Sequence, residues 1–232
     1  MNNNKIKMIA FDLDGTLYFN KDFILKAYQD TILEINNKYN RNINCPSLED
    51  IMMQTGNPIT KIFKNLFINE SEEFLIKIST LLLKKVVYHV INKNGKIAVG
   101  AEYILKILHK AGYKIALVSN GRSGFIVPVL KTYNLLQYFE PLYFIDGFKY
   151  KFKADLLNNL LDKYNITSDE LILVGDRKSD MVSAKIVGCK TIGCKYGYGK
   201  ENELDDADYK INSLFEIIPI INKENKNIIK RI

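Results

Sequence analysis

Asp12 and Asp14 stand two residues apart in the segment Asp-Leu-Asp-Gly-Thr, directly after the apolar run 6–11. The run predicts a short buried strand, and Gly15 predicts a turn at its end. Two neighbouring carboxylates at such a place are costly to desolvate unless positive charge lies between them. A magnesium ion with a phosphoryl group would supply that charge, because Mg²⁺ prefers oxygen ligands and usually accompanies substrate phosphates. A solvated acidic loop is the alternative, and it is common for Asp-x-Asp alone.

A second apolar run, 115–118, ends in Ser119, Asn120 and Gly121. A small hydroxyl and a short amide at the carboxyl end of a strand suit phosphate binding, and Gly121 allows backbone N–H groups to approach the oxygens. The same three residues are also an ordinary turn signal, so this segment alone does not decide between the two interpretations.

A third apolar run, 171–174, ends in Gly175 and Asp176, and Asp180 follows four residues after Asp176. This spacing can place both carboxylates on one helix face directed toward the strand end. Asp180 could instead be a first-turn acid favoured by the helix dipole. Lys151 and Lys153 stand at the entry to an expected helix, where a lysine could neutralise phosphate charge or simply be solvated.

These segments, in this order, resemble the motifs of the haloacid dehalogenase superfamily, and the likeness covers most of the chain. Residues 12–16 match the first motif, Ser119 and Asn120 the second, and Asp176 with Asp180 the fourth. Residues 193–199, followed by residues 207–209, resemble the phosphoglycolate phosphatase-like members in particular.

The third motif departs from its usual form. Many relatives carry Lys-Pro-x-Pro-Asp, whereas residues 151–155 read Lys-Phe-Lys-Ala-Asp, without a proline. Alignment on Asp155 selects Lys151, and members with Lys-x-Asp or Lys-x-Glu before two apolar residues favour Lys153. We favour Lys153, because it stands at the expected helix start, and keep Lys151 as the alternative.

The resemblance implies a role for each of these residues. Asp12 would be the nucleophile that forms an aspartyl-phosphate, and Asp14 would protonate the leaving oxygen and then activate water. Mg²⁺ would be held by the Asp12 carboxylate, the Asp14 backbone carbonyl and Asp176, with Asp180 in support. Phosphoryl oxygens would be bound by four residues: Thr16, Ser119, Asn120 and the lysine of the third motif.

The pattern of elements predicts an α/β fold with a doubly wound parallel sheet, similar to the Rossmann-like core of the superfamily. Strands are expected at 6–11, 114–118, 142–145, 171–174 and 190–193, alternating with helices at 100–111, 123–134, 154–164 and 179–187. All motif residues then fall at the carboxyl ends of strands, where such sheets bind ligands. Residues 223–232 are expected to be a solvated helix end or a frayed tail.

The stretch between the first two strands has helical periodicity, with a helix at about 20–39 and an N-cap at Ser47. We therefore expect residues 19–95 to form a helical cap, inserted into a core of residues 1–18 and 96–232, as in capped subclass I of the superfamily. Residues 54–58 form a polar break between helices. They are either a plain connector or, as the resemblance implies, a loop that selects substrate through Thr55, Gly56 and Asn57.

Composition restricts the function further. The net charge is +7 over 232 residues, but the lysines are spread and arginine is scarce, so we expect no nucleic-acid partner. No stretch reaches the roughly 18 apolar residues that span a membrane. An odd, scattered set of cysteines and no evident leader predict reduced thiols in the cytoplasm, at Cys45, Cys189 and Cys194. His89 and His109 stand far from the motifs and are expected to be structural or surface residues.

The expected function is Mg²⁺-dependent hydrolysis of a small phosphorylated metabolite by a phosphoglycolate phosphatase-like enzyme, acting as a monomer or homodimer. A sugar phosphomutase similar to β-phosphoglucomutase would use the same aspartates but return the phosphoryl group to the sugar. A non-catalytic binding protein on the same fold is the third possibility, although such proteins commonly lose one of the aspartates. Phosphoglycolate, a sugar phosphate, a nucleotide and pyrophosphate all suit a small covered site.

Overall fold

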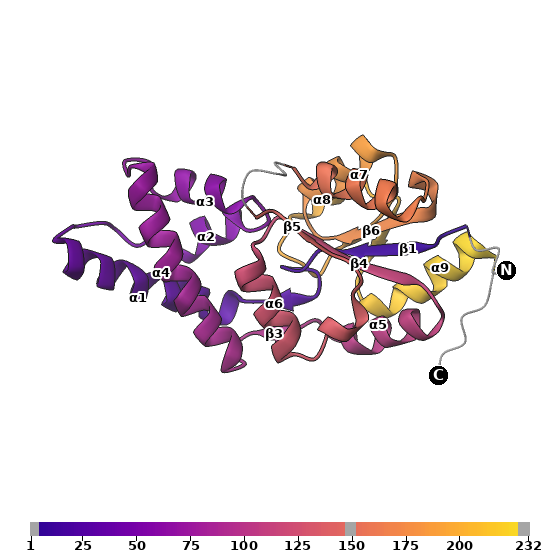
Figure 1. Ribbon diagram of the computed structural model, residues 1–232, viewed down its shortest axis with the longest axis horizontal. Coiled ribbons are helices and arrows are strands. Elements are labelled where there is room, and N and C mark those ends of the chain that lie inside the picture. Colours follow the sequence, from indigo (N-terminus) through magenta and orange to yellow (C-terminus); the bar gives the residue numbers. More distant parts are fainter. Residues whose placement is uncertain (1–4, 147–151, 227–232) are drawn as a thin grey trace.

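The computed structural model describes residues 5–146 and 152–226 and has two parts (Figure 1). One part is a six-stranded sheet with helices on both faces, and the other is a group of four helices at one end of it. The strands of the sheet are β1 (Met8–Phe11), β4 (Lys114–Ser119), β5 (Leu142–Phe144), β6 (Leu171–Gly175), β7 (Lys190–Cys194) and β8 (Tyr209–Ile211).

The sheet has the order β5-β4-β1-β6-β7-β8, and every pairing in it is parallel. From β1 the chain continues outward through β4 and β5 on one side and through β6, β7 and β8 on the other. The strand order therefore reverses at β1, which confirms the expected doubly wound α/β fold.

Both faces of the sheet are covered, which explains the continuous apolar runs of its strands. Successive residues of β1 alternate between the faces: Ile9 and Phe11 belong to one hydrophobic cluster, and Met8 and Ala10 belong to the other. The first cluster is completed by α5 (Ala101–Lys110), α6 (Ser123–Thr132) and α9 (Ile217–Asn225), and the second by α7 (Lys153–Tyr164) and α8 (Lys178–Val187).

The four remaining α-helices pack together at the end of the sheet part that lies away from α5 and α9 (Figure 1). They are α1 (Lys21–Tyr39), α2 (Leu48–Gln54), α3 (Ile59–Leu66) and α4 (Glu72–Ile91). Ser47 caps α2 as predicted, because its hydroxyl accepts a hydrogen bond from the Asp50 N–H at 3.1 Å. α4 packs against both α1 and α6, so one hydrophobic cluster runs from these helices into the sheet part.

Two very short strands connect the four helices with the sheet part. β2 (Tyr18–Phe19) precedes α1, β3 (Lys96–Ile97) follows α4, and the two pair antiparallel. The chain therefore enters and leaves the helical group through one paired segment. Of the expected cap boundaries, 19 is the second residue of β2 and 95 directly precedes β3, and both boundaries stay a prediction.

The carboxyl-terminal region differs from its expected form. Sequence periodicity did not predict β8, and Asn225 is buried rather than part of a solvated end. Its side chain accepts a hydrogen bond from the Ile6 N–H at 2.6 Å and donates one to the Tyr113 hydroxyl at 2.7 Å. The expectation for residues 223–232 is therefore wrong at Asn225, and residues 227–232 lie outside the described part.

Four 3-10 turns complete the described elements: η1 (Leu136–Tyr138), η2 (Ser168–Glu170), η3 (Glu201–Leu204) and η4 (Leu214–Glu216). Across residues 5–146 and 152–226, none of the helices combines the length and apolar character needed to cross a bilayer.

Candidate active site

The carboxyl ends of β1, β4 and β6 lie at one edge of the sheet, and each carries a polar residue predicted for the site. Asp12 directly follows β1, Ser119 ends β4, and Asp176 directly follows β6. β1 lies between the other two strands, so the three residues meet where the strand order reverses. Open parallel sheets bind ligands at such a point.

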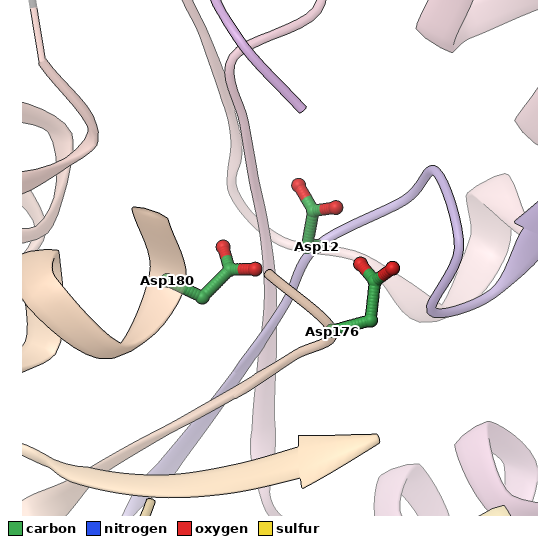
Figure 2. Close-up of side chains that lie close together, drawn as sticks. All are labelled: Asp12, Asp176 and Asp180. Carbon is green, nitrogen blue, oxygen red and sulfur yellow. The ribbon is translucent and has the colours of Figure 1, made fainter. Parts of the chain in front are cut away.

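Three aspartates converge at this edge (Figure 2). Asp12, Asp176 and Asp180 can each place one carboxylate oxygen within 4.8 Å of the others. All three are buried, with exposed fractions of 4%, 0% and 0%. Asp180 lies in the first turn of α8, and its Oδ2 accepts a hydrogen bond from the Arg177 N–H at 3.0 Å. Asp180 is thus both a first-turn acid and a member of the carboxylate cluster.

Lys153 supplies positive charge to this cluster from the first position of α7. Its Nζ donates to Asp12 Oδ1 at 2.7 Å and also to Asp180 Oδ1. Burial alone would lower the pKa of Lys153, but the two carboxylates outweigh this effect and raise it. Of the two lysines considered from the sequence, Lys153 reaches the site, and Lys151 lies outside the described residues.

The cluster nevertheless holds more negative than positive charge, because three aspartates and one lysine leave a formal charge of −2. Burial, reinforced by Asp180 and Asp12, raises the pKa of Asp176 to about 8. Burial also raises the pKa of Asp12, although Lys153 opposes this shift. A divalent cation would offset the excess charge, and carboxylate oxygens are the ligands that Mg²⁺ prefers. The residues present therefore fit a magnesium ion.

Asp176 is held in place by backbone and side-chain donors. Its Oδ2 accepts hydrogen bonds from the N–H groups of Tyr198 at 2.7 Å and Gly199 at 3.3 Å. The Thr16 hydroxyl donates to Oδ1 at 3.4 Å. Gly15 packs directly against this carboxylate at a φ of +81°, a conformation and a spacing that exclude a Cβ atom. The glycine of the first motif is therefore needed both for its turn and for its contact.

Asp14 is not part of the cluster of three aspartates, but it lines the adjoining cavity together with Asp12. Its Oδ1 accepts a hydrogen bond from the Asn20 side-chain amide at 3.2 Å. Burial raises the pKa of Asp14 well above its ordinary value, and the carboxylates of Asp12 and Asp176 raise it further. The environment therefore favours the protonated acid at this position.

The second motif connects the sheet edge with the helical group. Ser119 is buried, and its hydroxyl accepts a hydrogen bond from the Gly121 N–H at 3.2 Å. The Asn120 amide donates to the Gly56 carbonyl at 2.7 Å, while its Oδ1 is buried without a hydrogen-bond partner among the described residues. One polar group of Asn120 is thus committed to the 54–58 loop, and phosphate binding by this side chain stays a prediction.

A cavity of about 130 Å³ lies between the two parts of the molecule. Its polar side is formed by Asp12, Asp14, Ser119 and Asn120, and the predicted loop contributes Thr55, Gly56 and Asn57. Most of the remaining lining residues are aliphatic or aromatic. All three loop residues therefore line the same cavity as Asp12 and Asp14. A loop that only connected two helices would have no need to lie there.

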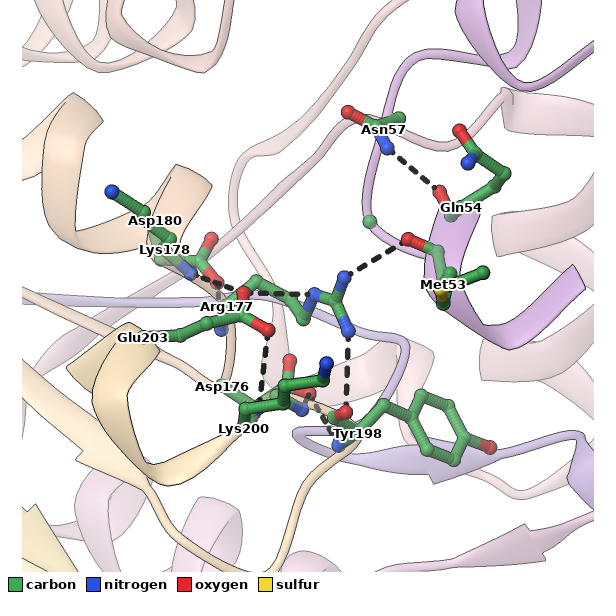
Figure 3. A network of polar contacts seen from close by, with 12 residues as sticks. Met53, Gln54, Asn57, Asp176, Arg177, Lys178, Asp180, Tyr198, Lys200 and Glu203 are labelled. Atoms are coloured by element: carbon green, nitrogen blue, oxygen red, sulfur yellow. Dashed lines mark hydrogen bonds and ion pairs between the residues drawn. The ribbon is translucent and has the colours of Figure 1, made fainter. Parts of the chain in front are cut away.

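Arg177 forms polar contacts with both parts of the molecule, and the sequence patterns did not single it out (Figure 3). Its guanidinium donates to the backbone carbonyls of Met53, at the end of α2, and Tyr198, both at 3.2 Å. Glu203 lies 3.4 Å from Nε. Tyr198 also donates its own N–H to Asp176, so Arg177 links the helical group to the segment that holds a site carboxylate. Only its position next to Asp176 could have indicated this role.

The histidines and cysteines lie away from the lining of this cavity. His89 stacks on Phe23 with ring centroids 4.9 Å apart, and His109 lies beside Tyr138. The three cysteines are free thiols, and Cys189 and Cys194 are buried. The placement of the two histidines agrees with the structural or surface roles expected from the sequence.

Comparisons with known proteins identify the family of this chain. The sequence model of the haloacid dehalogenase-like hydrolases matches residues 9–194. A phosphoglycolate phosphatase of Vibrio vulnificus is 30% identical over 233 residues, which cover 95% of this chain and 98% of the relative. The pyrophosphatase PpaX of Halalkalibacterium halodurans is 26% identical over 94% of this chain and 97% of its own length.

Solved structures show the same fold. The crystal structure of a predicted phosphoglycolate phosphatase from Haemophilus somnus superimposes with a TM-score of 0.83, at 18% identity, over 93% of this chain and 98% of the other. The family match spans well over half of the chain and includes every motif residue described above. The chain therefore belongs to the haloacid dehalogenase-like hydrolase family, as a phosphatase similar to the phosphoglycolate phosphatases.

Proposed function

We propose that the protein is a Mg²⁺-dependent phosphatase that hydrolyses a small phosphate monoester through an aspartyl-phosphate on Asp12. One observation carries the proposal. Asp12 belongs to the buried carboxylate cluster and also lines the cavity. The same residue can therefore contact both a metal ion in the cluster and a substrate in the cavity. The relatives named as phosphoglycolate phosphatase and pyrophosphatase support this reaction class.

Asp12 is suited to nucleophilic attack because the ammonium group of Lys153 lies beside its carboxylate and favours the ionised form. The 2.7 Å hydrogen bond from Lys153 engages Oδ1 and opposes the effect of burial on the pKa of Asp12. A carboxylate is a weak nucleophile, so positioning must supply much of the rate enhancement. The contact of Lys153 with Asp180 fixes the direction of the ammonium group, which makes Asp180 a positioning residue for the lysine.

Asp14 is suited to acid–base chemistry. Its raised pKa favours the protonated acid, which can give a proton to the leaving oxygen, and the carboxylate formed after transfer can then accept a proton from water. The hydrogen bond from Asn20 holds Oδ1 in place, so the side chain is positioned before substrate arrives.

Mg²⁺ would be held by the carboxylates of Asp12 and Asp176 and the backbone carbonyl of Asp14, with Asp180 in support. When bound, the ion would neutralise charge on the transferring phosphoryl group and between the carboxylates. We assign the phosphoryl oxygens to Ser119, Asn120 and Lys153. Thr16 was predicted to join them, and its hydroxyl is directed to Asp176 in this structure.

We further propose that residues 19–95 act as the cap domain on a core of residues 1–18 and 96–232. Thr55, Gly56 and Asn57 would then restrict which esters enter the cavity. A small space with mostly apolar walls favours small substrates and excludes bulk water during the reaction.

Phosphate release over a panel of phosphorylated compounds tests the proposed function. The panel contains phosphoglycolate, pyrophosphate, a hexose phosphate and a nucleoside monophosphate, each with Mg²⁺ and with excess chelator. We expect phosphate release that requires Mg²⁺ and disappears in Asp12→Asn. An isomerised sugar phosphate in place of free phosphate would identify a phosphomutase, and full turnover in chelator would contradict the role of the ion.

A further inference from the structure

The guanidinium of Arg177 binds three acceptors that come from three separate segments (Figure 3). Nη2 donates to the Met53 carbonyl of the helical group, and Nη1 donates to the Tyr198 carbonyl after β7. Nε pairs with Glu203 of η3, and the whole side chain is only 14% exposed. A guanidinium is a rigid planar fork, so three engaged nitrogens fix its orientation. The position of each segment is therefore linked to the positions of the other two.

On the core side, Arg177 is connected to the Asp176 carboxylate through one peptide group. The Tyr198 carbonyl and the Gly199 N–H belong to the same planar peptide. Arg177 donates to the oxygen of this peptide at 3.2 Å, and the N–H of the peptide donates to Asp176 Oδ2 at 3.3 Å. The N–H of Tyr198 donates to the same carboxylate oxygen at 2.7 Å. A tilt of the peptide that Arg177 holds would therefore move a donor that orients Asp176.

On the side of the helical group, Arg177 holds the start of the 54–58 loop. The last carbonyls of a helix lack partners within it, and the Met53 carbonyl near the end of α2 accepts from Arg177 at 3.2 Å. Gly56 lies directly against the same side chain, because a Cβ atom there would come within 3.0 Å of the Arg177 Cγ. Three residues of this loop line the cavity. One side chain thus contacts both the loop and the segment that orients Asp176.

We propose that Arg177 is a positioning residue that couples the 54–58 loop to Asp176, so that Mg²⁺ binding orders the loop and an ordered loop strengthens Mg²⁺ binding. The inference rests on the proposed function, in which Asp176 holds the ion and the loop restricts the substrate. When an ion fixes the Asp176 carboxylate, the shared peptide and the guanidinium that holds Met53 are fixed with it. Coupling between two sites is reciprocal and typically changes each affinity by about 5- to 150-fold.

Mg²⁺ alone, without a substrate, tests this coupling. Hydrogen-exchange mass spectrometry follows the amides of residues 54–57 in the full chain, in excess chelator and in saturating Mg²⁺. We expect Mg²⁺ to slow their exchange by at least about 5-fold in the wild type. Arg177→Lys keeps the positive charge, but an ammonium group cannot replace a planar fork that serves three acceptors. This variant should therefore lose the slowing that depends on Mg²⁺.

Calorimetry with Mg²⁺ measures the reciprocal effect. Arg177→Lys should bind the ion at least about 5-fold more weakly than the wild type. Arg177→Gln separates orientation from charge, because removal of a cation next to Asp176 would by itself strengthen the binding of another cation. Weaker binding by Arg177→Gln would support the positioning role, and tighter binding would contradict it.

Ser79→Ala is the matched control for a contact that only joins the two parts. The Ser79 hydroxyl on α4 accepts a hydrogen bond at 3.0 Å from Nη2 of Arg122, at the N-cap position of α6. Ser79→Ala should change neither the Mg²⁺ affinity nor the slowing of exchange by Mg²⁺. If Arg177 also only joins the two parts, Arg177→Lys will speed loop exchange equally with and without Mg²⁺ and will keep the wild-type affinity. That outcome would overturn the proposal.

Phosphate release distinguishes failure of this inference from failure of the proposed function. Phosphate release that requires Mg²⁺, by a wild type whose loop exchange does not respond to Mg²⁺, would overturn the inference alone. A loop response that requires Arg177, without phosphate release from any compound of the panel, would retain the inference and contradict the phosphatase. A wild type that binds no Mg²⁺ would contradict both.

Discussion

Replacing Asp176 by asparagine is expected to stabilise the metal-free protein at pH 8 and to abolish its response to Mg²⁺. In the folded chain Asp176 is fully buried beside two other carboxylates, which raises its pKa from 3.8 to about 8. In the unfolded chain the same group ionises near its ordinary pKa. Between these two values the folded state therefore holds a proton that the unfolded state has already released.

The sign and size of the effect follow from this difference. A group with a raised folded-state pKa makes no unfavourable contribution below about pH 4, lowers stability progressively as pH rises toward 8, and has its full effect above that value. At about 1.36 kcal/mol for each pKa unit, the full contribution is on the order of 5 kcal/mol. Because the repulsion on Asp176 is shared with Asp180 and Asp12, we expect the single substitution to recover at least about 2 kcal/mol at pH 8, or roughly 4–8 °C in Tm.

Urea and thermal unfolding of the metal-free protein between pH 5 and 8 measure this effect. Wild-type stability should fall across the range, and Asp176→Asn should have a clearly smaller slope. Mg²⁺ should stabilise the wild type most at pH 8 and leave the variant unchanged. Asp206→Asn is the matched control, because Asp206 is exposed and pairs only loosely with Lys185, at 3.5 Å. A wild-type slope near zero, or a variant less stable than the wild type at pH 8, would refute the reasoning.

Three further predictions concern the reacting groups. Asp12→Asn should lower turnover by at least about 1000-fold without unfolding the protein, as circular dichroism and phosphate release will show; residual activity within tenfold of the wild type would exclude Asp12 as the nucleophile. Asp14→Asn should slow esters with poor leaving groups far more than aryl phosphates and should allow a phospho-enzyme to accumulate, which acid-quench labelling detects; equal losses without a trapped intermediate would contradict its acid–base role. Lys153→Met should destabilise the metal-free protein by about 3–5 kcal/mol in urea unfolding at pH 7, because it leaves buried carboxylates without their cation, whereas Lys185→Met, on the surface, should have little effect.

The part of the site that was predictable from sequence is the part built on strand ends. Asp12, Ser119 and Asp176 each follow an apolar run, and parallel strands bring their carboxyl ends to one edge. The helix start likewise favoured Lys153, and the structure places its ammonium on Asp12. Local pattern and chain topology together were sufficient for these residues.

The remaining site residues depend on contacts between distant segments. Arg122 meets Ser79 and Arg177 meets Met53 only because the helical group folds back over the sheet edge, and no periodicity encodes that arrangement. β2 and β3 have two residues each, too few to show an alternation of apolar and polar side chains. The burial of Asn225 was missed for a related reason, because its partners lie at the other end of the chain and in another element.

The close packing around Asp176 has a consequence for ligand affinity. Gly15 and Gly197 both press on its side chain where any Cβ atom would collide, and two backbone N–H groups hold Oδ2. The carboxylate is thus restricted to one orientation before any ion arrives, and the rotational freedom that a mobile aspartate would lose on binding has already been lost on folding. Such preorganisation lowers the stability of the metal-free protein and raises the affinity for the ion. The metal-free folded state is destabilised by the repulsion between neighbouring carboxylates, and binding of the ion relieves this repulsion.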